Sequence, residues 1–344
     1  MRPILLAAAV SFIASLVITP YVIRYFRERG FGQMIREDTT HHAAKAGTPT
    51  MGGTAILLAA LAGWVTARAV GVDVTPTGLL VLGTFTAMGA VGFLDDFIKV
   101  RMKRNLGLNK TAKFGGQALI AVTFAYLGPH FGGISQRLSF VSEFSGPMPP
   151  LLFVVWVFLM LVGTSNAVNL TDGLDGLAAG ASVQVLAAYT IIAFWQFRHP
   201  ADYAIAPGPA ADLAVIAASA MAASAGFLWW NAPPAKVFMG DTGSLALGGL
   251  LAALALSTHT QLLLVALGGL FVIETLSVIG QVFFFRVLGR RILRMAPLHH
   301  HFEMQGWQET TVIVRFWIVA GVGVAVGLGL FYTEFLARGG ASGG

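Results

Sequence analysis

Ten apolar stretches, each long enough to cross a lipid bilayer as a helix, dominate this chain of 344 residues. A helix that crosses the hydrocarbon core needs about 20 mostly apolar residues. The stretches are centred on residues 2–25, 52–71, 77–98, 113–130, 149–168, 176–197, 211–230, 242–258, 261–287 and 311–336. The first has no clear small-residue cleavage site, so we interpret it as a retained span rather than a signal peptide. The pattern predicts an all-α integral membrane protein with about ten transmembrane helices. We expect one polytopic domain over residues 1–338 and a flexible tail over 339–344.

Composition narrows the class of protein further. Hydrophobic residues make up 56% of the chain and charged residues only 11%, whereas a soluble globular domain carries about 25% charged residues. So few charges cannot cover a surface that faces water, which excludes a soluble globular enzyme, a disordered chain and a nucleic-acid binder. The chain has no cysteine, so disulfides, thiolate metal sites and cysteine nucleophiles are excluded as well.

The distribution of lysine and arginine predicts how the helices are oriented. With ten spans, the connections after spans 1, 3, 5, 7 and 9 lie on one side, and 17 of the 22 basic residues fall there. Short loops rich in lysine and arginine face the cytoplasm. Both termini are therefore expected on the extracytoplasmic side. The acidic and histidine-containing motifs fall with the basic loops, so we expect the active site on the cytoplasmic side.

Two adjacent carboxylates, Asp95 and Asp96, close the third stretch in the run GFLDDFIKV. Carboxylates within a membrane segment are costly and mark functional sites. The alternative is plain interfacial charge, balanced by basic residues such as Lys99 and Lys103. Neighbouring helical side chains diverge by about 100°, so the pair suits two separate tasks better than one shared ion.

Polar residues also recur across the boundary between the fifth and sixth stretches, in the run NAVNLTDGLDG. They are Asn166, Asn169, Asp172 and Asp175. Gly173 and Gly176 permit a sharp turn or the close approach of a ligand. Helix capping explains one of the four polar residues but not all of them, so the run is a candidate binding segment.

Asp241 precedes the eighth stretch in the run FMGDTGS, where a helix N-terminus is expected. Capping of that helix is one interpretation. A functional interpretation uses the same geometry, because the free N–H groups at a helix start bind phosphate. A carboxylate beside them can hold Mg²⁺ together with substrate phosphate oxygens.

Three consecutive histidines, His299, His300 and His301, lie between the ninth and tenth stretches. They point in different directions on a helix or a strand, so they cannot easily close on one zinc ion. The alternatives are a solvated basic loop and hydrogen bonding to phosphate or sugar oxygens. A further loop, before the second stretch, holds Lys45 in the run KAGTPTMGG, where glycine and proline could merely shape the loop.

These five clusters are all expected at one membrane face. Together they supply carboxylates, a helix start and cations, which are the groups that phosphoryl transfer with a divalent metal requires. The clustering therefore indicates a membrane-bound phosphoryl-transfer enzyme.

Five runs are similar to those of the phospho-N-acetylmuramoyl-pentapeptide transferase family, within the polyprenyl-phosphate N-acetylhexosamine-1-phosphate transferase superfamily. In order they are GTPTMGG, GFLDDFIKV, NAVNLTDGLDG, MGDTGSLALGG and APLHHHFEMQGW. The resemblance extends from about Lys45 to Arg315. The paired aspartates and the NLTDG-like run occur across the superfamily, whereas the triple histidine and the TPTMGG run point to the muramoyl-pentapeptide branch.

The resemblance implies a specific reaction. Undecaprenyl phosphate would attack the sugar-linked phosphate of UDP-N-acetylmuramoyl-pentapeptide, releasing UMP and leaving lipid I in the inner leaflet of the bacterial cell membrane. It also implies Mg²⁺ as the cofactor, a homodimer as the assembly and contact with membrane lipids.

The resemblance further implies roles for individual residues. Asp241 would bind the metal, and Asp95 and Asp96 would act near the lipid phosphate and the metal, with Asp96 as a second metal ligand. The histidines His299, His300 and His301 would complete the catalytic set at the phosphates or sugar. The nucleotide and pyrophosphate pocket would be lined by Lys45, Asn166, Asn169, Asp172, Asp175, Phe238 and Gln281. Phosphate charge would be held by Lys99, Lys103 and Lys113.

The charge of the nucleophile constrains the mechanism. A phosphate monoester has a second pKa of about 6 and is largely dianionic at neutral pH, so the lipid nucleophile scarcely needs a base. Positioning and charge neutralisation then supply most of the rate. We favour direct in-line displacement, with Asp95 orienting the nucleophile or accepting a proton. The alternative is a covalent aspartyl-phosphate route.

Three other functions are alternatives to this one. A secondary transporter places ionisable groups near the bilayer midplane, on interrupted helices in two related halves, whereas these acids cluster at span ends and no repeat is detected. A membrane phosphatase would use similar metal chemistry. A sister enzyme that transfers N-acetylglucosamine-1-phosphate to the same lipid is the nearest alternative.

Overall fold

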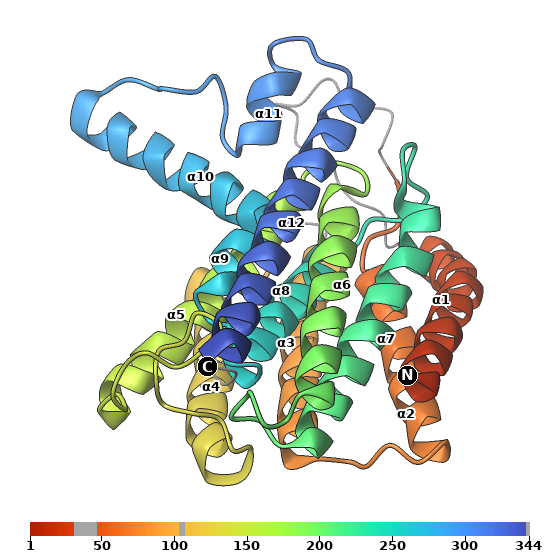
Figure 1. The fold of residues 1–344 in the computed structure, drawn as a ribbon. Coiled ribbons are helices and arrows are strands. Elements are labelled where there is room, and N and C mark those ends of the chain that lie inside the picture. Colours follow the sequence, from red (N-terminus) through yellow and green to blue (C-terminus); the bar gives the residue numbers. More distant parts are fainter. Residues whose placement is uncertain (31–46, 103–106, 342–344) are drawn as a thin grey trace.

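The computed structural model describes residues 1–30, 47–102 and 107–341 as a bundle of helices (Figure 1). In chain order the helices are α1 (Arg2–Glu28), α2 (Gly53–Ala69), α3 (Pro76–Arg101), α4 (Lys110–Phe131), α5 (Pro150–Thr171), α6 (Leu177–Arg198), α7 (Pro207–Asn231), α8 (Gly240–Ser257), α9 (Leu263–Leu267), α10 (Gly269–Leu288), α11 (Leu298–Glu303) and α12 (Glu309–Ala341). These described ranges contain no β-strand, and an isolated bridge joins Ser139 and Glu143. The predicted all-α fold class is confirmed.

Each of the ten predicted stretches is helical. In the described part of the chain, eight helices are long and apolar enough to cross a membrane, and α2 is a shorter apolar helix. The ninth stretch differs from the single span that was predicted, because the helix breaks at Gly268 between α9 and α10. Two successive glycines, Gly268 and Gly269, weaken a helix at this point because glycine loses the most backbone entropy on folding.

The start of α1 and the end of α12 lie at the same end of the bundle, and α11 lies at the opposite end (Figure 1). An even number of crossings produces this arrangement. α10 leaves the bundle at an angle, and only Leu270, Phe271 and Glu274 of this helix are buried. The side of the membrane that each end faces stays a prediction from the basic loops.

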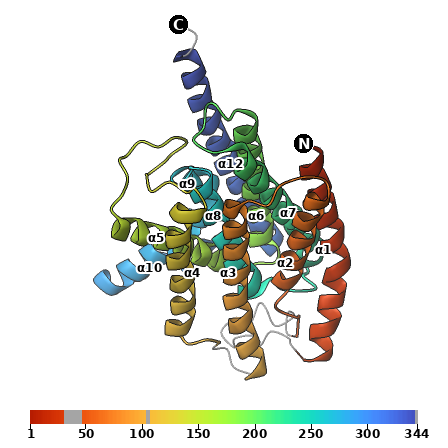
Figure 2. The ribbon, with the colours of Figure 1, turned by 90° about the horizontal axis from the view of Figure 1, so that it is seen from below.

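Helix α8 lies in the centre of the bundle (Figure 2), where it packs against α3 and α5. Its residues from Thr242 to Ser257 are all buried. They are small or apolar on every side, a composition typical of a helix that is enclosed by other helices. Gly248 lies directly against the backbone of Ser165 in α5, where a side chain would overlap with it. The tight packing holds the N-terminus of α8 in a defined position.

A buried carboxylate joins α2, α3 and α7 at the end of the bundle that holds the termini. Asp212 is fully buried in α7 and forms an ion pair with Arg68. It also accepts hydrogen bonds from Trp64 Nε1 at 3.0 Å, from the Thr75 backbone N–H at 3.0 Å and from Thr75 Oγ1 at 2.9 Å. A buried charge is tolerated when it is paired and hydrogen-bonded in this way, so Asp212 anchors three helices.

Candidate active site

Three carboxylates from two helices meet at the end of the bundle away from the termini. Asp95 and Asp96 belong to the C-terminal part of α3, Asp241 belongs to the first turn of α8, and an oxygen of each lies within 4.8 Å of the others. The helices approach closely because Gly92 of α3 lies against the Asp241 backbone, where a Cβ would overlap with the carbonyl group. Two motifs far apart in the sequence therefore form one acidic cluster.

Two lysines neutralise part of the negative charge. Lys99 Nζ lies 2.5 Å from Asp95 Oδ2 and 2.8 Å from Asp241 Oδ2. Lys113 Nζ, in the first turn of α4, lies 2.6 Å from the same Asp241 oxygen. The resemblance assigns Lys99 and Lys113 to phosphate charge, and in the structure both ammonium groups lie against the aspartates. Three carboxylates against two ammonium groups leave the cluster with net negative charge.

Asp96 caps the N-terminus of α8. Its Oδ1 accepts the backbone N–H of Asp241 at 3.2 Å, and its Oδ2 accepts the Thr242 backbone N–H at 3.0 Å and the Thr242 hydroxyl at 2.8 Å. The first N–H groups of a helix have no partner within the helix, and a carboxylate is favoured there by the helix dipole. Asp95 is held differently, because its Oδ1 accepts the Leu108 backbone N–H at 2.9 Å. The two neighbouring acids therefore do different things, as the divergence of adjacent helical side chains predicts.

The two asparagines of α5 are at different distances from the cluster. Asn169 Nδ2 donates to Asp241 Oδ1 at 2.7 Å and to Ser244 Oγ at 2.8 Å. Asn166 lies one turn earlier and donates to Gln117 Oε1 at 3.3 Å. Asn169 is therefore part of the cluster, whereas Asn166 connects α5 to α4.

Asp172 is a fourth carboxyl group near the cluster. It follows the last residue of α5 and is half-buried. Burial raises the pKa of the Asp172 carboxyl, and the charges of Asp241 and Asp96 raise that pKa further, while a hydrogen bond from the Gly240 amide opposes the shift. Its carboxyl group therefore accepts a proton more readily than a solvated aspartate does.

Asp175 has structural contacts in the same turn. It is buried, its Oδ2 accepts the Ala235 backbone N–H at 2.9 Å, and its own backbone N–H donates to Glu309 Oε1 at 3.1 Å. Gly176 follows with a φ of +77°, a left-handed conformation that favours glycine. The turn between α5 and α6 is thereby tied to the segment after α7 and to the start of α12.

The three histidines of α11 have three different sets of partners. His299 is fully buried, with Nδ1 lying 3.1 Å from Glu274 Oε1 of α10. His300 Nδ1 lies 2.6 Å from Glu303 Oε2, and His301 Nδ1 accepts the Arg294 backbone N–H at 3.0 Å. The expectation that consecutive histidines diverge agrees with this geometry. Among the described residues, the group with metal-site geometry is the aspartate cluster.

The remaining predicted residues lie around this region or outside the described residues. Phe238 is partly exposed, and its backbone is bonded to the segment before α2 through Pro49 O and Gly52 N. Gln281 of α10 is occupied by backbone groups, because its Oε1 accepts the Leu293 N–H at 2.9 Å and its Nε2 donates to Leu293 O at 2.9 Å. The predictions for Lys45 and Lys103 lie outside the described residues.

Comparisons with known proteins show the family to which the chain belongs. Residues 78–259 match the family described as glycosyl transferase family 4, and residues 45–57 match a phospho-N-acetylmuramoyl-pentapeptide-transferase signature. A relative from Saccharopolyspora erythraea, named phospho-N-acetylmuramoyl-pentapeptide-transferase, is 53% identical over 98% of this chain and 98% of its own length. One of the same name from Frankia casuarinae is 54% identical over 99% of this chain and 100% of its own length. The chain belongs to this transferase family.

The family match covers the acidic cluster. The range 78–259 begins two residues into α3 and extends past the end of α8, so it includes Asp95, Asp96 and Asp241, whereas α11 and its histidines follow it. A third relative with the same name, from Mycobacteroides abscessus, is 50% identical over 98% of this chain and 99% of its own length. With eight helices in the described residues that can cross a membrane, this transferase is a multi-pass bacterial membrane protein.

The donor set of the transferase suits a hard divalent cation. Carboxylate oxygens are the ligands that Mg²⁺ prefers in proteins. Asp241 is contacted by the ammonium groups of Lys99 and Lys113 and by the Asn169 amide. It is therefore the carboxylate around which positive charge gathers in this cluster. The net negative charge that remains after Lys99 and Lys113 are counted would be offset by such an ion.

Two functional candidates were missed by the sequence analysis. Glu274 is a fully buried acid in α10, and Thr242 supplies two of the three donors to Asp96. Glu274 carried a usable signal, because an ionisable residue within an apolar stretch marks a site. Thr242 carried none, because its role depends on Asp96 reaching α8 from another helix.

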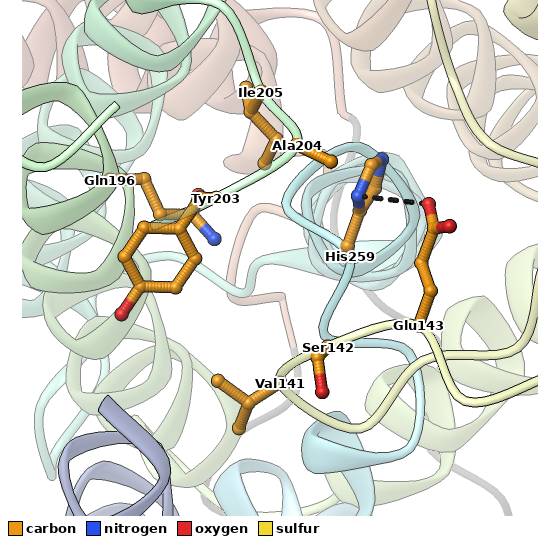
Figure 3. Close-up of a pocket in the computed structure, with 8 residues that line it drawn as sticks. All are labelled: Val141, Ser142, Glu143, Gln196, Tyr203, Ala204, Ile205 and His259. Carbon is orange, nitrogen blue, oxygen red and sulfur yellow. Dashed lines mark ion pairs between the residues drawn. The ribbon is translucent and has the colours of Figure 1, made fainter. Parts of the chain in front are cut away.

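A separate cavity of about 100 Å³ lies in the loops near the other end of the bundle. In Figure 3, Glu143 and His259 form one side and Gln196 and Tyr203 the other. His259 Nδ1 lies 3.4 Å from Glu143 Oε1. None of the predicted site residues lines this cavity, so it is distinct from the acidic cluster.

Proposed function

We propose that this chain transfers phospho-N-acetylmuramoyl-pentapeptide from UDP-N-acetylmuramoyl-pentapeptide to undecaprenyl phosphate. The products are lipid I and UMP, and the reaction is the first membrane step of peptidoglycan synthesis. One observation carries the proposal: Asp95, Asp96 and Asp241 gather with Lys99 and Lys113 at one end of a membrane bundle whose relatives bear the name of this activity. Acidic and ammonium groups in this arrangement suit a phosphate substrate and a metal ion.

Mg²⁺ is the proposed cofactor. Asp241 would hold the ion, with Asp96 as the second ligand and Asp95 within reach, since the three carboxylates offer oxygens within 4.8 Å of one another. Bound there, the ion would neutralise charge that develops on the phosphates during transfer. The hydrogen bonds from Asp241 N–H and Thr242 to Asp96 support this geometry, because they fix the relative positions of the two ligands.

The chain's own residues would bind and align the two phosphates. Lys99 and Lys113 would hold phosphate oxygens, and Asp95, anchored by the Leu108 N–H, would orient the lipid phosphate or accept its proton. Since the lipid phosphate is already largely dianionic at neutral pH, alignment of the two phosphates contributes more to the reaction rate than base catalysis does. We therefore favour in-line displacement over an aspartyl-phosphate intermediate.

The remaining predicted residues are proposed to surround the substrates. The uridine and pyrophosphate would be contacted by Lys45, Asn166, Asn169, Asp172, Asp175, Phe238 and Gln281, and further phosphate charge by Lys103. His299, His300 and His301 would act beside the phosphates or sugar. We also propose that the acidic cluster faces the cytoplasm, that both termini lie outside, and that the enzyme works as a homodimer among membrane lipids.

Two assays test the proposal. Purified protein is given undecaprenyl phosphate with either UDP-N-acetylmuramoyl-pentapeptide or UDP-N-acetylglucosamine, and the lipid product is identified by mass. Lipid I from the first donor alone supports the proposal, whereas exclusive use of the second assigns the chain to the sister reaction. In the second assay, a phosphorylated enzyme trapped with the UDP-sugar in the absence of lipid would overturn in-line displacement.

A further inference from the structure

A buried acid and a buried histidine face each other beside the turn that carries Asp172. Glu274 of α10 and His299 of α11 are both fully buried, and Glu274 Oε1 lies 3.1 Å from His299 Nδ1. Neither atom makes a hydrogen bond in the described structure, so this approach is the polar contact that the two atoms share. Burying a charged or polar group without a partner is costly. Each atom is therefore the polar neighbour that lowers this cost for the other.

The second oxygen of Glu274 fixes the helix that carries the histidine. Glu274 Oε2 accepts the Leu298 backbone N–H at 2.8 Å, in the first turn of α11. The residue before this helix is Pro297, and it provides no side-chain cap. A single carboxylate from α10 thus holds both the backbone of α11 and the imidazole of its second residue.

The other side of the imidazole faces the turn that carries Asp172. His299 Nε2 lies against Gly173, where a side chain on that residue would overlap with it. Nε2 is buried and has no hydrogen-bond partner in the described structure. Gly173 itself is exposed, so the backbone of one glycine separates this nitrogen from solvent at the edge of the candidate site.

A carboxylate accepts hydrogen bonds and cannot donate them. A carboxylate oxygen 3.1 Å from Nδ1 therefore favours a proton on Nδ1, and the lone pair of a neutral imidazole is then at Nε2. The partner of one ring nitrogen sets the tautomer and orientation of a histidine in this way. Whether His299 Nε2 carries a proton or a lone pair beside the Asp172 turn thus depends on Glu274 of α10.

We propose that Glu274 is a positioning residue for the transfer reaction. It holds His299 as the Nδ1–H tautomer and directs Nε2 toward the Asp172 turn. This inference rests on the proposed function, since the reaction that it serves is the one proposed above. The inference assigns a role in the reaction to a residue of α10, which lies outside the acidic cluster.

The test is the isosteric variant Glu274→Gln in the full-length protein. Glutamine can still accept the Leu298 N–H but can present an amide N–H₂ to Nδ1, which favours the wrong tautomer. We expect kcat to fall by about 10- to 100-fold, by analogy with the loss seen when the partner that orients a metal-ligating histidine is removed. KM for the UDP-sugar should change less than about threefold, with an unchanged melting temperature. Glu334→Gln, in α12 far from α11, is the matched control and should keep wild-type kcat.

A double-mutant cycle separates positioning from plain stability. If Glu274 acts through His299, then Glu274→Gln adds little further loss in a His299→Ala background, because contacting residues are coupled. An equal loss in both backgrounds would overturn the inference. So would wild-type kcat in Glu274→Gln. Absence of lipid I from the wild-type protein would instead refute the proposed function, so the two failures are distinguishable.

A direct measurement covers the case in which Glu274→Gln does not fold. Wild-type protein is labelled with ¹⁵N-histidine, and the His299 signals are assigned by their loss in His299→Gln. The proposal requires a protonated Nδ1 in the resting enzyme. A His299 with bare Nδ1 and protonated Nε2 would overturn it.

Discussion

The Asp96 carboxylate accepts the backbone N–H of Asp241 at 3.2 Å, so one acid of the cluster holds the helix that carries another. Asp96 also accepts both donors of Thr242. A carboxylate at a helix start stabilises that helix through its free N–H groups and its dipole. The hydrogen bonds by which Asp96 caps α8 therefore set the distance between the acids of α3 and Asp241 of α8.

The cap predicts graded effects of substitution at Asp96 and Thr242. Asp96→Asn replaces a charged acceptor by an amide and should lower kcat by about tenfold or more, with a loss of about 1 kcal/mol of stability typical of a cap. Thr242→Val removes one of three donors and should have a smaller effect in the same direction. Initial rates and melting curves check both. If Thr242→Val matches wild type in kcat and stability, Asp96 does not work through the cap.

Asp241→Ala should abolish turnover while the protein stays folded. The proposed ion would lose its central ligand, and stabilisation by a metal of several kcal/mol corresponds to a loss on the order of 10³-fold. Activity is measured across a Mg²⁺ titration, with melting temperature as the folding control. Asp73→Asn, an acid in the loop between α2 and α3, should retain wild-type activity. Full activity of Asp241→Ala at saturating Mg²⁺ would remove Asp241 from the metal site.

Stability should fall on acidification because of His259. Burial lowers the pKa of His259, and the charge of Glu143 only partly opposes this shift. The unfolded chain, with an ordinary histidine pKa near 6.5, then takes up a proton at a higher pH than the folded protein does. The contribution of His259 to the free energy of unfolding is therefore present above about pH 6.5. It is lost as the pH falls toward the lowered pKa, by up to about 1.4 kcal/mol per pH unit.

His259→Asn is the variant that checks this pH dependence. His259 has a φ of +53°, a conformation that asparagine tolerates better than most residues. Unfolding is followed between about pH 7.5 and 5 in detergent. In the variant, the number of protons taken up on unfolding, given by the slope of the free energy of unfolding against pH, should be smaller by about one. An identical slope in both proteins would contradict the assignment.

Asp212→Ala should destabilise the fold without changing the chemistry. Removal of this carboxylate leaves Arg68, Trp64 and Thr75 without their buried partner. Breaking a buried ion pair on one side costs about 3–5 kcal/mol. Denaturation curves give the loss, and the specific activity of the remaining folded fraction should match wild type. Replacing both Arg68 and Asp212 by apolar residues should restore part of the stability, because no charge is then left unpaired.

Sequence patterns located most of the candidate site but not its internal contacts. The grouping of Asp95 and Asp96 with Asp241 followed from motifs expected at one face, and the structure brings them together with Lys99 and Lys113. The structure places His299 behind the Asp172 turn, against Glu274 and Gly173, and Asn166 toward Gln117. These contacts join different helices, so no local pattern contains them.

The sequence by itself determined that this chain is a membrane-embedded helical enzyme. Long apolar stretches must form helices in lipid, because no water is available to satisfy the backbone, and the charged motifs are confined to their ends. Tertiary structure alone decided which group each acid contacts. Asp96 accepts the first N–H groups of α8, Asp95 accepts the Leu108 amide, and Glu274 lies against the buried histidine of α11. Hydrogen bonds and ion pairs extend only a few ångströms, so they are set by how the helices pack and not by spacing along the chain.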